Sequence, residues 1–220
     1  MKFKLIRLYA KLKTMLIFDR EERRYKRNQI INSMNTKYIF GRNVIRTAKS
    51  IGDDFYCGGY SKVNKNTILS NKVCFNGMQI HGNGNVFIGQ HFHSGVECLI
   101  ITQNHNYDKA DAIPYDDRYI YKDVVIDDFV WIGSRVMILP GTHIGEGAII
   151  QGGSVVHGEI PPYAIAGGNP AKVFKYRDVE HFKKLKKERK FLTDEYKWNL
   201  QKSRYSNQTL AGVERTREGE

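Results

Sequence analysis

A six-residue repeat runs through the middle of the chain and limits its possible folds more than any other feature. Apolar residues, with one serine among them, recur at this spacing in three runs: Ile39, Ile45, Ile51, Cys57, Val63, Leu69 and Phe75; Ile88, Ser94 and Ile100; and Ile126, Ile132, Ile138, Ile144, Ile150 and Val156. The period fits neither an α-helix, with about 3.6 residues per turn, nor a coiled coil, with a repeat of about seven residues. The repeat therefore argues against a helical fold.

Instead, the repeat predicts a chain that makes a short strand, turns a corner and starts again. Three such units form one triangular coil, and stacked coils pair strand on strand as a parallel β-helix with the repeated side chains inside. A sandwich of ordinary strands would show alternation with period two and irregular spacing. We interpret the glycines that follow repeated positions as corners whose backbone conformation a Cβ atom would obstruct: Gly52, Gly58, Gly89, Gly133 and Gly145. The expected fold class is mainly β.

Two interruptions break the repeat. Between Phe75 and Ile88, thirteen residues replace the expected twelve, and the glycines of "HGNGNVF" favour a bulge or a longer corner there. The second interruption, residues 106–125, is too long for a corner, so the chain must leave the coil as an excursion. Long ordered excursions from a rigid scaffold tend to carry function.

The N-terminal segment, residues 1–38, is strongly basic. The whole chain has a formal net charge of +12, which favours an anionic partner, and the basic residues concentrate near its two ends. Leu5, Leu8 and Leu12 recur at helical spacing among lysines and an arginine. This pattern predicts a basic amphipathic helix that either packs on a neighbouring element or lies on an anionic membrane surface. No small-residue cleavage site follows, so we expect no export.

Other features of the sequence bear on the C-terminal end and on the cellular compartment. Residues 178–206 have the apolar spacing of a helix, and residues 207–220 form a polar tail that we expect to be mobile. Cys57, Cys74 and Cys98 show no pairing pattern, which suits small apolar fillers in a reducing compartment such as the cytoplasm. No segment approaches the length of a transmembrane helix.

Several longer motifs within residues 39–177 resemble those of a known family. They are "HNYD" before a loop that ends in "IYKDVVIDDFVWIG", then "VWIGSRVMILPG", "IGEGAIIQGGSVV" and "IPPYAIAGGNPAKVFKYR". The chain is similar to the left-handed β-helix, hexapeptide-repeat acyltransferases, in the branch of galactoside, maltose, nodulation-factor and xenobiotic acetyltransferases and of polysaccharide O-acetyltransferases. The resemblance implies acetyl-CoA as co-substrate, no metal, and a homotrimer with active sites between neighbouring subunits.

His105 is the candidate catalytic base. Acetyl transfer from a thioester to a hydroxyl needs a group that takes the hydroxyl proton, and an imidazole can take it near neutral pH and return it to the departing thiolate. His105 is the last residue before the excursion, and the resemblance places the family's catalytic histidine there. The alternation of His91 and His93 in "HFH" suggests a metal site, but we interpret both as solvated.

The resemblance also implies residues that bind the co-substrate. Trp131 matches the aromatic residue along the pantetheine arm, and Lys172 and Lys175 match basic positions at the phosphorylated adenosine end. The other cofactor-binding candidates are Ser134, Gly152, Gly153 and His157. The resemblance does not fix the acceptor site; its candidates, chosen because they lie next to His105 or inside the excursion, are Asn104, Asn106, Tyr107, Asp108 and Asp116.

Four functions remain open at this point. The first is an O-acetyltransferase that acts on a glycan or a nucleotide-sugar or lipid-linked precursor, in the cytoplasm or at the inner membrane face. The second is an N-acetyltransferase of an amino-sugar nucleotide, which would use the same base and cofactor. The third is a metal lyase like the γ-class carbonic anhydrases, which needs three histidine ligands. The fourth is a non-catalytic scaffold, which would not need His105. We expect no nucleic-acid partner.

Overall fold

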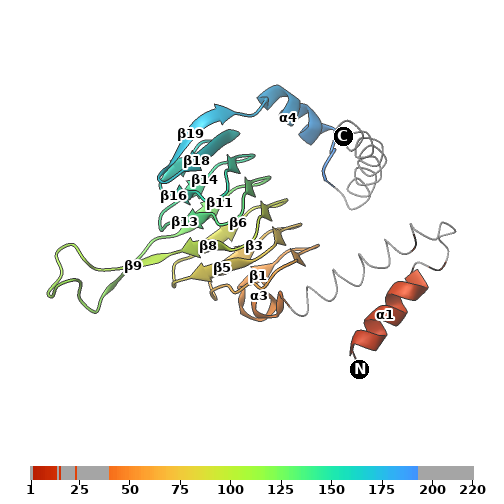
Figure 1. Ribbon diagram of the computed structural model, residues 1–220, viewed down its shortest axis with the longest axis horizontal. Coiled ribbons are helices and arrows are strands. Elements are labelled where there is room, and N and C mark those ends of the chain that lie inside the picture. The colour runs from red at the N-terminus through yellow and green to blue at the C-terminus, as the bar shows by residue number, and fades with distance from the viewer. Residues whose placement is uncertain (1, 14, 16–22, 24–39, 193–220) are drawn as a thin grey trace, which may run out of the picture. The chain divides into compact units, whose positions relative to one another are not determined.

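The computed structural model describes residues 2–13, 15, 23 and 40–192, and parallel strands dominate the last of these ranges (Figure 1). The strands stack in three sheets, called here the first, second and third faces. The first face contains β1 (Ser50–Ile51), β3 (Thr67–Leu69), β6 (Val86–Ile88), β11 (Val124–Ile126), β14 (His143–Ile144) and β17 (Glu159–Ile160). The second contains β2 (Tyr56–Cys57), β4 (Cys74–Phe75), β7 (His93–Ser94), β12 (Trp131–Ile132), β15 (Ile149–Ile150) and β18 (Ala164–Gly168). The third contains β5 (Met78–His81), β8 (Cys98–Ile101), β13 (Met137–Ile138) and β16 (Val155–Val156).

Successive coils stack in register. From β11 to β16, each strand residue pairs with the residue eighteen positions later, as Trp131 does with Ile149 on the second face and Met137 does with Val155 on the third. Eighteen residues are three six-residue units, so each unit supplies one strand and each coil supplies one strand to each face. The prediction of a parallel β-helix is confirmed. β19 (Ala171–Tyr176) ends the coil by turning back antiparallel on β18, immediately after Gly167 and Gly168.

The repeated side chains fill the interior. Every repeated residue from Cys57 to Val156 is buried, and so are the residues two positions earlier in the last run: Val130, Val136, Thr142, Ala148 and Ser154. Burying one large aliphatic side chain contributes about 1.5–3 kcal/mol, so these columns are the main stabilising feature of the coil. The polar members bond locally, since Ser154 donates to the carbonyl of Gln151 at 2.6 Å and Thr142 to that of Leu139 at 2.7 Å.

Two of the three cysteines, Cys57 and Cys98, belong to this interior. All three are buried and form no disulfide. Burial raises the pKa of the Cys57 and Cys98 thiols, which keeps them protonated and unreactive. The predicted role as apolar fillers is confirmed for these two, whereas Cys74 lies in the outward column of the second face, in register with His93.

The start of the coil differs from the prediction. Ile45 is not an inward strand residue, because residues 42–47 form the helix α3 (Arg42–Thr47) and its side chain is exposed. Val44 is buried against the core instead, and the Asn43 side chain accepts a hydrogen bond from the amide of Val63 at 3.0 Å. The six-residue spacing at Ile45 is therefore a coincidence within a short helix that covers the first core residues. Ile39 lies outside the described residues.

The glycines at the corners are needed for a different reason from the predicted one. The glycines that follow repeated positions have no positive φ; what they need is space. A Cβ atom on Gly133 would lie 2.5 Å from the amide nitrogen of Gly152 in the next coil, and one on Gly145 would lie 2.5 Å from the nitrogen of Pro162. The left-handed conformation occurs in larger residues at two corners: between the first and second faces in Asp54, Lys72, His91, Phe129 and Tyr163, and between the second and third faces in Glu97 and Arg135. The conformational explanation of these glycines was therefore wrong, and close approach between coils replaces it.

The two predicted interruptions are present. The extra residue lies in the corner between β5 and β6, where Gly82 has a φ of +93°. The excursion begins and ends as a hairpin of β9 (Gln103–His105) and β10 (Tyr119–Tyr121), which Figure 1 shows projecting from the coil together with its loop. The coil resumes at Val124, slightly earlier than expected.

Two further helices lie outside the coil. α1 (Lys2–Lys13) forms where the sequence predicts a basic helix. α4 (Val179–Lys187) belongs to a second compact unit that begins at Asp178, whose side chain caps the helix by accepting from the amide of His181 at 2.9 Å. The rest of the predicted C-terminal helix and the tail, from residue 193 on, lie outside the described residues. None of the described helices is both long enough and apolar enough to span a membrane.

Candidate active site

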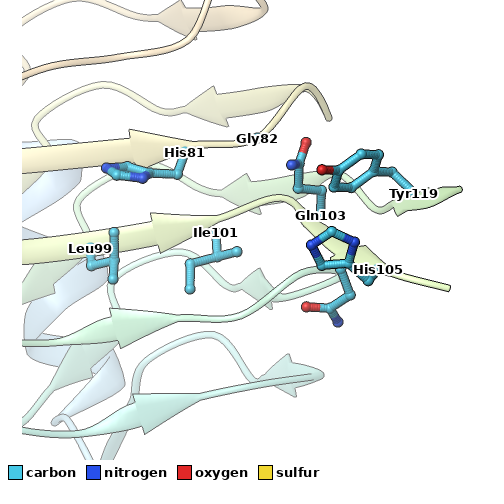
Figure 2. Close-up of a pocket in the computed structure, with 8 residues that line it drawn as sticks. His81, Gly82, Leu99, Ile101, Gln103, His105 and Tyr119 are labelled. Atoms are coloured by element: carbon cyan, nitrogen blue, oxygen red, sulfur yellow. The ribbon is translucent and has the colours of Figure 1, made fainter. Parts of the chain in front are cut away.

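His105 lies where the third face ends and the excursion begins. It is the last residue of β9, and the hairpin register places it directly opposite Tyr119 of β10. Figure 2 shows its ring at the edge of a pocket in which strand side chains of the third face lie beside residues of the hairpin. The lining residues are His81, Gly82, Leu99, Ile101, Gln103, Asn104, His105 and Tyr119. The coil thus supplies one wall of the pocket, including His81, and the hairpin supplies His105 and Tyr119.

Two tyrosine rings pack on the imidazole of His105. The ring of Tyr115 stacks on it with a centroid distance of 3.8 Å and an angle of 18° between planes, and the ring of Tyr119 lies 4.6 Å away at 37°. Within the described part of the chain, the Nδ1 atom of His105 is buried and has no hydrogen-bond partner. Nε2 is therefore the nitrogen that a substrate can reach.

Asp116 organises the loop of the excursion. Its carboxylate accepts hydrogen bonds from the Asn106 amide at 2.8 Å, from the backbone N–H of Asp111 at 3.2 Å, and from the backbone N–H and Nε of Arg118, both at 2.9 Å. The Arg118 guanidinium holds the pKa of this carboxyl well below its usual range. Asp116 is buried, so its oxygens are occupied within the loop, and we interpret it as an anchor of the excursion rather than an acceptor contact.

The other acceptor candidates occupy different places. Asn104 lines the pocket beside His105, whereas Asn106 bonds to Asp116. Tyr107 and Asp108 are exposed on the projecting loop, away from any partner that the described residues provide. Among the acceptor candidates of one described chain, only Asn104 therefore lines the same pocket as His105.

Most of the cofactor candidates gather on another part of the coil. Trp131 of β12 points outward and is half-exposed. Its column on the second face continues in register through Ile149 and Ile165 to Lys175 of β19. An apolar strip with a cation at its far end suits a pantetheine arm followed by phosphates.

Small residues form the corner beside this strip. Gly152 and Gly153 follow β15, in the coil after the one that contains Ser134. The amide of Gly153 donates to the carbonyl of Ser134 at 2.8 Å. Lys172 lies opposite Gly167 at the end of the same column of corners. A row without bulky side chains lets a ligand approach the backbone closely.

His157 lies elsewhere. It follows β16 of the third face and is exposed at the corner column that leads to the first face, which is the edge of the coil that carries His105. The candidate residues thus fall into two groups on the described coil, called here the half-sites, which the third face separates: one with His105 and His157, the other with Trp131, Ser134 and Lys175.

Sequence reasoning missed the two tyrosines that contact His105. Their only signal was the set of tyrosines in the excursion, and pairing Tyr119 with His105 required the hairpin register. No group of three or more histidine, cysteine, aspartate or glutamate side chains suited to a metal ion occurs among the described residues. His91 stacks on Phe129 at 4.9 Å, while His93 lies on β7 in register with Trp131.

Comparisons with known proteins agree with this architecture. Residues 123–158 match the family model described as bacterial transferase hexapeptide (six repeats). A chloramphenicol acetyltransferase from Klebsiella aerogenes is 36% identical over 113 residues, which are 46% of this chain and 52% of that protein. A probable macrolide acetyltransferase from Lysinibacillus sphaericus is 37% identical over 97 residues, or 38% of this chain and 54% of that protein. The chain spans about half the length of these relatives.

A solved structure shows the same fold. It is a mutant of an N-acyltransferase from Bacillus cereus, in complex with dTDP and coenzyme A. The two structures superpose with a TM-score of 0.55 at 16% sequence identity, over 64% of this chain and 79% of that one.

Proposed function

We propose that the chain, of which residues 123–158 match the hexapeptide transferase model, is an acetyl-CoA-dependent O-acetyltransferase that modifies a sugar hydroxyl of a surface polysaccharide or its precursor. The observation that supports this most is the placement of His105, held at the pocket edge with Nε2 accessible. The acceptor hydroxyl loses its proton to Nε2 while its oxygen attacks the thioester carbonyl. When the carbon–sulfur bond breaks, the same proton passes to the sulfur and coenzyme A leaves as a thiol.

The column on the second face fits acetyl-CoA. Trp131 offers a flat apolar surface to the pantetheine arm, and Lys172 and Lys175 offer point charges to the phosphates. Gly152 and Gly153 let the arm approach the corner backbone. His157 lies with His105, so we assign it to the acceptor half of the site. No step of the transfer draws on a metal, because the thioester is already activated.

An acceptor panel tests the proposed activity. Acetyl-CoA is incubated with sugars, nucleotide sugars, isolated surface polysaccharide and chloramphenicol, and release of free thiol is recorded. Treating the product with mild alkali distinguishes the two transferase alternatives, because alkali removes an ester and leaves an amide. Acetyl transfer to an amino group would replace the proposed reaction by N-acetylation. A lack of release with every acceptor, at enzyme concentrations that bind acetyl-CoA, would contradict transferase activity on this panel.

A complete site requires a second chain. His105 and Trp131 lie at opposite sides of the third face. The outward column between these sides begins at Gln79 and continues through three apolar side chains, Leu99, Met137 and Val155. A neighbouring copy that covers this row would bring its own Trp131 column to His105. Closed rotational symmetry then gives a homotrimer with three equivalent sites.

We expect light scattering to give three copies of the 25.4 kDa chain. Subunit mixing tests the shared site more sharply. His105→Ala and Trp131→Ala chains are inactive or weak alone, but trimers refolded from an equal mixture contain both intact halves in about one quarter of their sites. We therefore expect about one quarter of wild-type activity. A mixture as inactive as its parents, or an active monomer, would contradict the shared site.

We further assign α1 to the surface of an anionic membrane, at its cytoplasmic side. Leu5, Leu8, Tyr9 and Leu12 are all exposed on the helix. The segment KFKLIRLYAKLK contains basic and no acidic residues, and Lys11 and Lys13 lie in its last turn. Apolar insertion and cations near an anionic surface reinforce each other, with each cation contributing about 1 kcal/mol at low salt. Such placement would bring the enzyme close to a lipid-linked sugar.

The double substitution Lys11→Glu with Lys13→Glu should abolish most co-sedimentation with phosphatidylserine vesicles at low salt, and leave transfer to a soluble acceptor unchanged. Lys184→Glu with Lys187→Glu in α4 changes the net charge equally and should leave co-sedimentation intact. If both pairs weaken it equally, the attraction comes from net charge rather than from α1. If wild-type protein ignores the vesicles, the membrane assignment is wrong.

A further inference from the structure

The buried nitrogen of His105 raises a question about how the base is oriented. A histidine that accepts a proton on Nε2 must carry its own hydrogen on Nδ1, and in many sites an acceptor at Nδ1 fixes both the tautomer and the ring orientation. In the part of the chain that the structure describes, Nδ1 of His105 has no such acceptor. Something other than a hydrogen bond must then hold the ring.

The aromatic contacts are the only other restraints described on this ring. Tyr115 stacks nearly parallel to the imidazole at 3.8 Å, and Tyr119 contacts it at 4.6 Å. Tyr115 and Tyr119 form no ring pair with each other within the described residues, so they restrain different parts of the imidazole. Aromatic pairs at these distances contribute beyond the area they bury, and they oppose rotation of the ring out of the stack.

Tyr115 is itself held in place by its neighbour in sequence. The Asp116 carboxylate ties together Asn106, Asp111 and Arg118, which come from both sides of the loop. Its low pKa keeps it ionised throughout the neutral range, so this anchor persists wherever the enzyme would work. Tyr119 is fixed separately by the β9–β10 register.

Building on the proposed role of His105, we propose that Tyr115 and Tyr119 are positioning residues that clamp the imidazole, in place of a hydrogen-bond acceptor at Nδ1. The clamp acts through the faces of the rings. Neither tyrosine hydroxyl makes a described hydrogen bond, so phenylalanine preserves the clamp and leucine removes it. Asp116 supports the clamp by fixing the loop on which Tyr115 lies.

The test compares Tyr115→Leu with Tyr115→Phe, and uses Tyr121→Leu as a matched control. Tyr121 lies on the same strand as Tyr119 and is similarly exposed, but its ring stacks on Tyr119, 6.3 Å away, rather than on His105. With acetyl-CoA and the most active acceptor of the panel, we expect Tyr115→Leu to lower kcat about ten-fold or more and to leave KM for acetyl-CoA within about two-fold. Tyr115→Phe and Tyr121→Leu should stay near wild type.

A second readout does not depend on turnover. In protein labelled at histidine, the His105 ring protons, identified from the His105→Asn variant, should be shifted upfield by the tyrosine ring currents. This shift should persist in Tyr115→Phe and be largely lost in Tyr115→Leu. Unchanged shifts in Tyr115→Leu would show that the stack does not exist in solution, and an equal loss of kcat in both Tyr115 variants would assign the effect to the hydroxyl. If His105→Ala retains turnover, the proposed base is wrong, while the shifts still decide whether the rings clamp it.

Discussion

Replacing His105 by alanine should lower the turnover of acetyl transfer by about two to four orders of magnitude, the usual contribution of a positioned general base. The effect should fall on kcat and kcat/KM together, because the proton moves only as the acceptor oxygen attacks. Stopped assays that follow free thiol measure it. Acetyl-CoA should bind the variant normally in calorimetry, since the proposed cofactor column lies on the second face and excludes this side chain.

A histidine outside both half-sites provides the control for this result. His181 lies in α4, in the second compact unit. The His181→Ala variant should therefore keep wild-type turnover. Circular dichroism of both variants checks that the fold is intact. Normal turnover by His105→Ala would remove His105 as the base and favour a function that does not need it.

The second large effect concerns stability: Ile144→Ala should lower the free energy of unfolding by about 2–5 kcal/mol. Ile144 is fully buried and pairs in register with Ile126 of the preceding coil and Ile160 of the following one. Its truncation opens a cavity between stacked coils that the rigid backbone cannot close. Urea unfolding followed by circular dichroism, with variants compared at one protein concentration because subunit association contributes, measures the change.

The adjacent residue of the same strand is the matched control. His143 points outward and meets Asp127 at 3.1 Å and Glu159 at 2.9 Å, with well over a third of its side chain exposed. Polar contacts at such exposure contribute little, so His143→Ala should change stability by less than about 1 kcal/mol. Equal effects of the two substitutions would mean that the interior columns do not dominate stability.

The coil was predictable because its contacts have fixed sequence offsets. Trp131 and Ile149 are three six-residue units apart, so counting along the sequence is enough to place them on the same face. No knowledge of which distant strands pair is needed. The same count places His157 at a different corner from the Trp131 column. The sequence therefore already separated these residues, although the resemblance of motifs had assigned both to the cofactor. Ile45 shows the opposite case, in which a matching interval arose inside a helix.

The excursion was not predictable in the same way. No period connects Tyr115 to His105, and their stacking depends on the loop geometry that Asp116 fixes through Asn106 and Arg118. From sequence, a polar residue in such a loop is equally suited to bind a sugar or to bind the loop itself. Only its burial and its hydrogen bonds distinguish the two roles of Asp116.

The stacking of coils also fixes the distance between Trp131 and Lys175 on the second face. From Trp131 to Lys175 the column crosses three strand spacings, which is about 14 Å because neighbouring strands lie about 4.8 Å apart. Inserting one further coil between them would lengthen this interval by one spacing. Under the proposed function, this insertion would move the cations away from the phosphates of acetyl-CoA bound at Trp131. The number of repeats would then determine the length of the molecule that the column can bind, independently of the chemistry performed at its end.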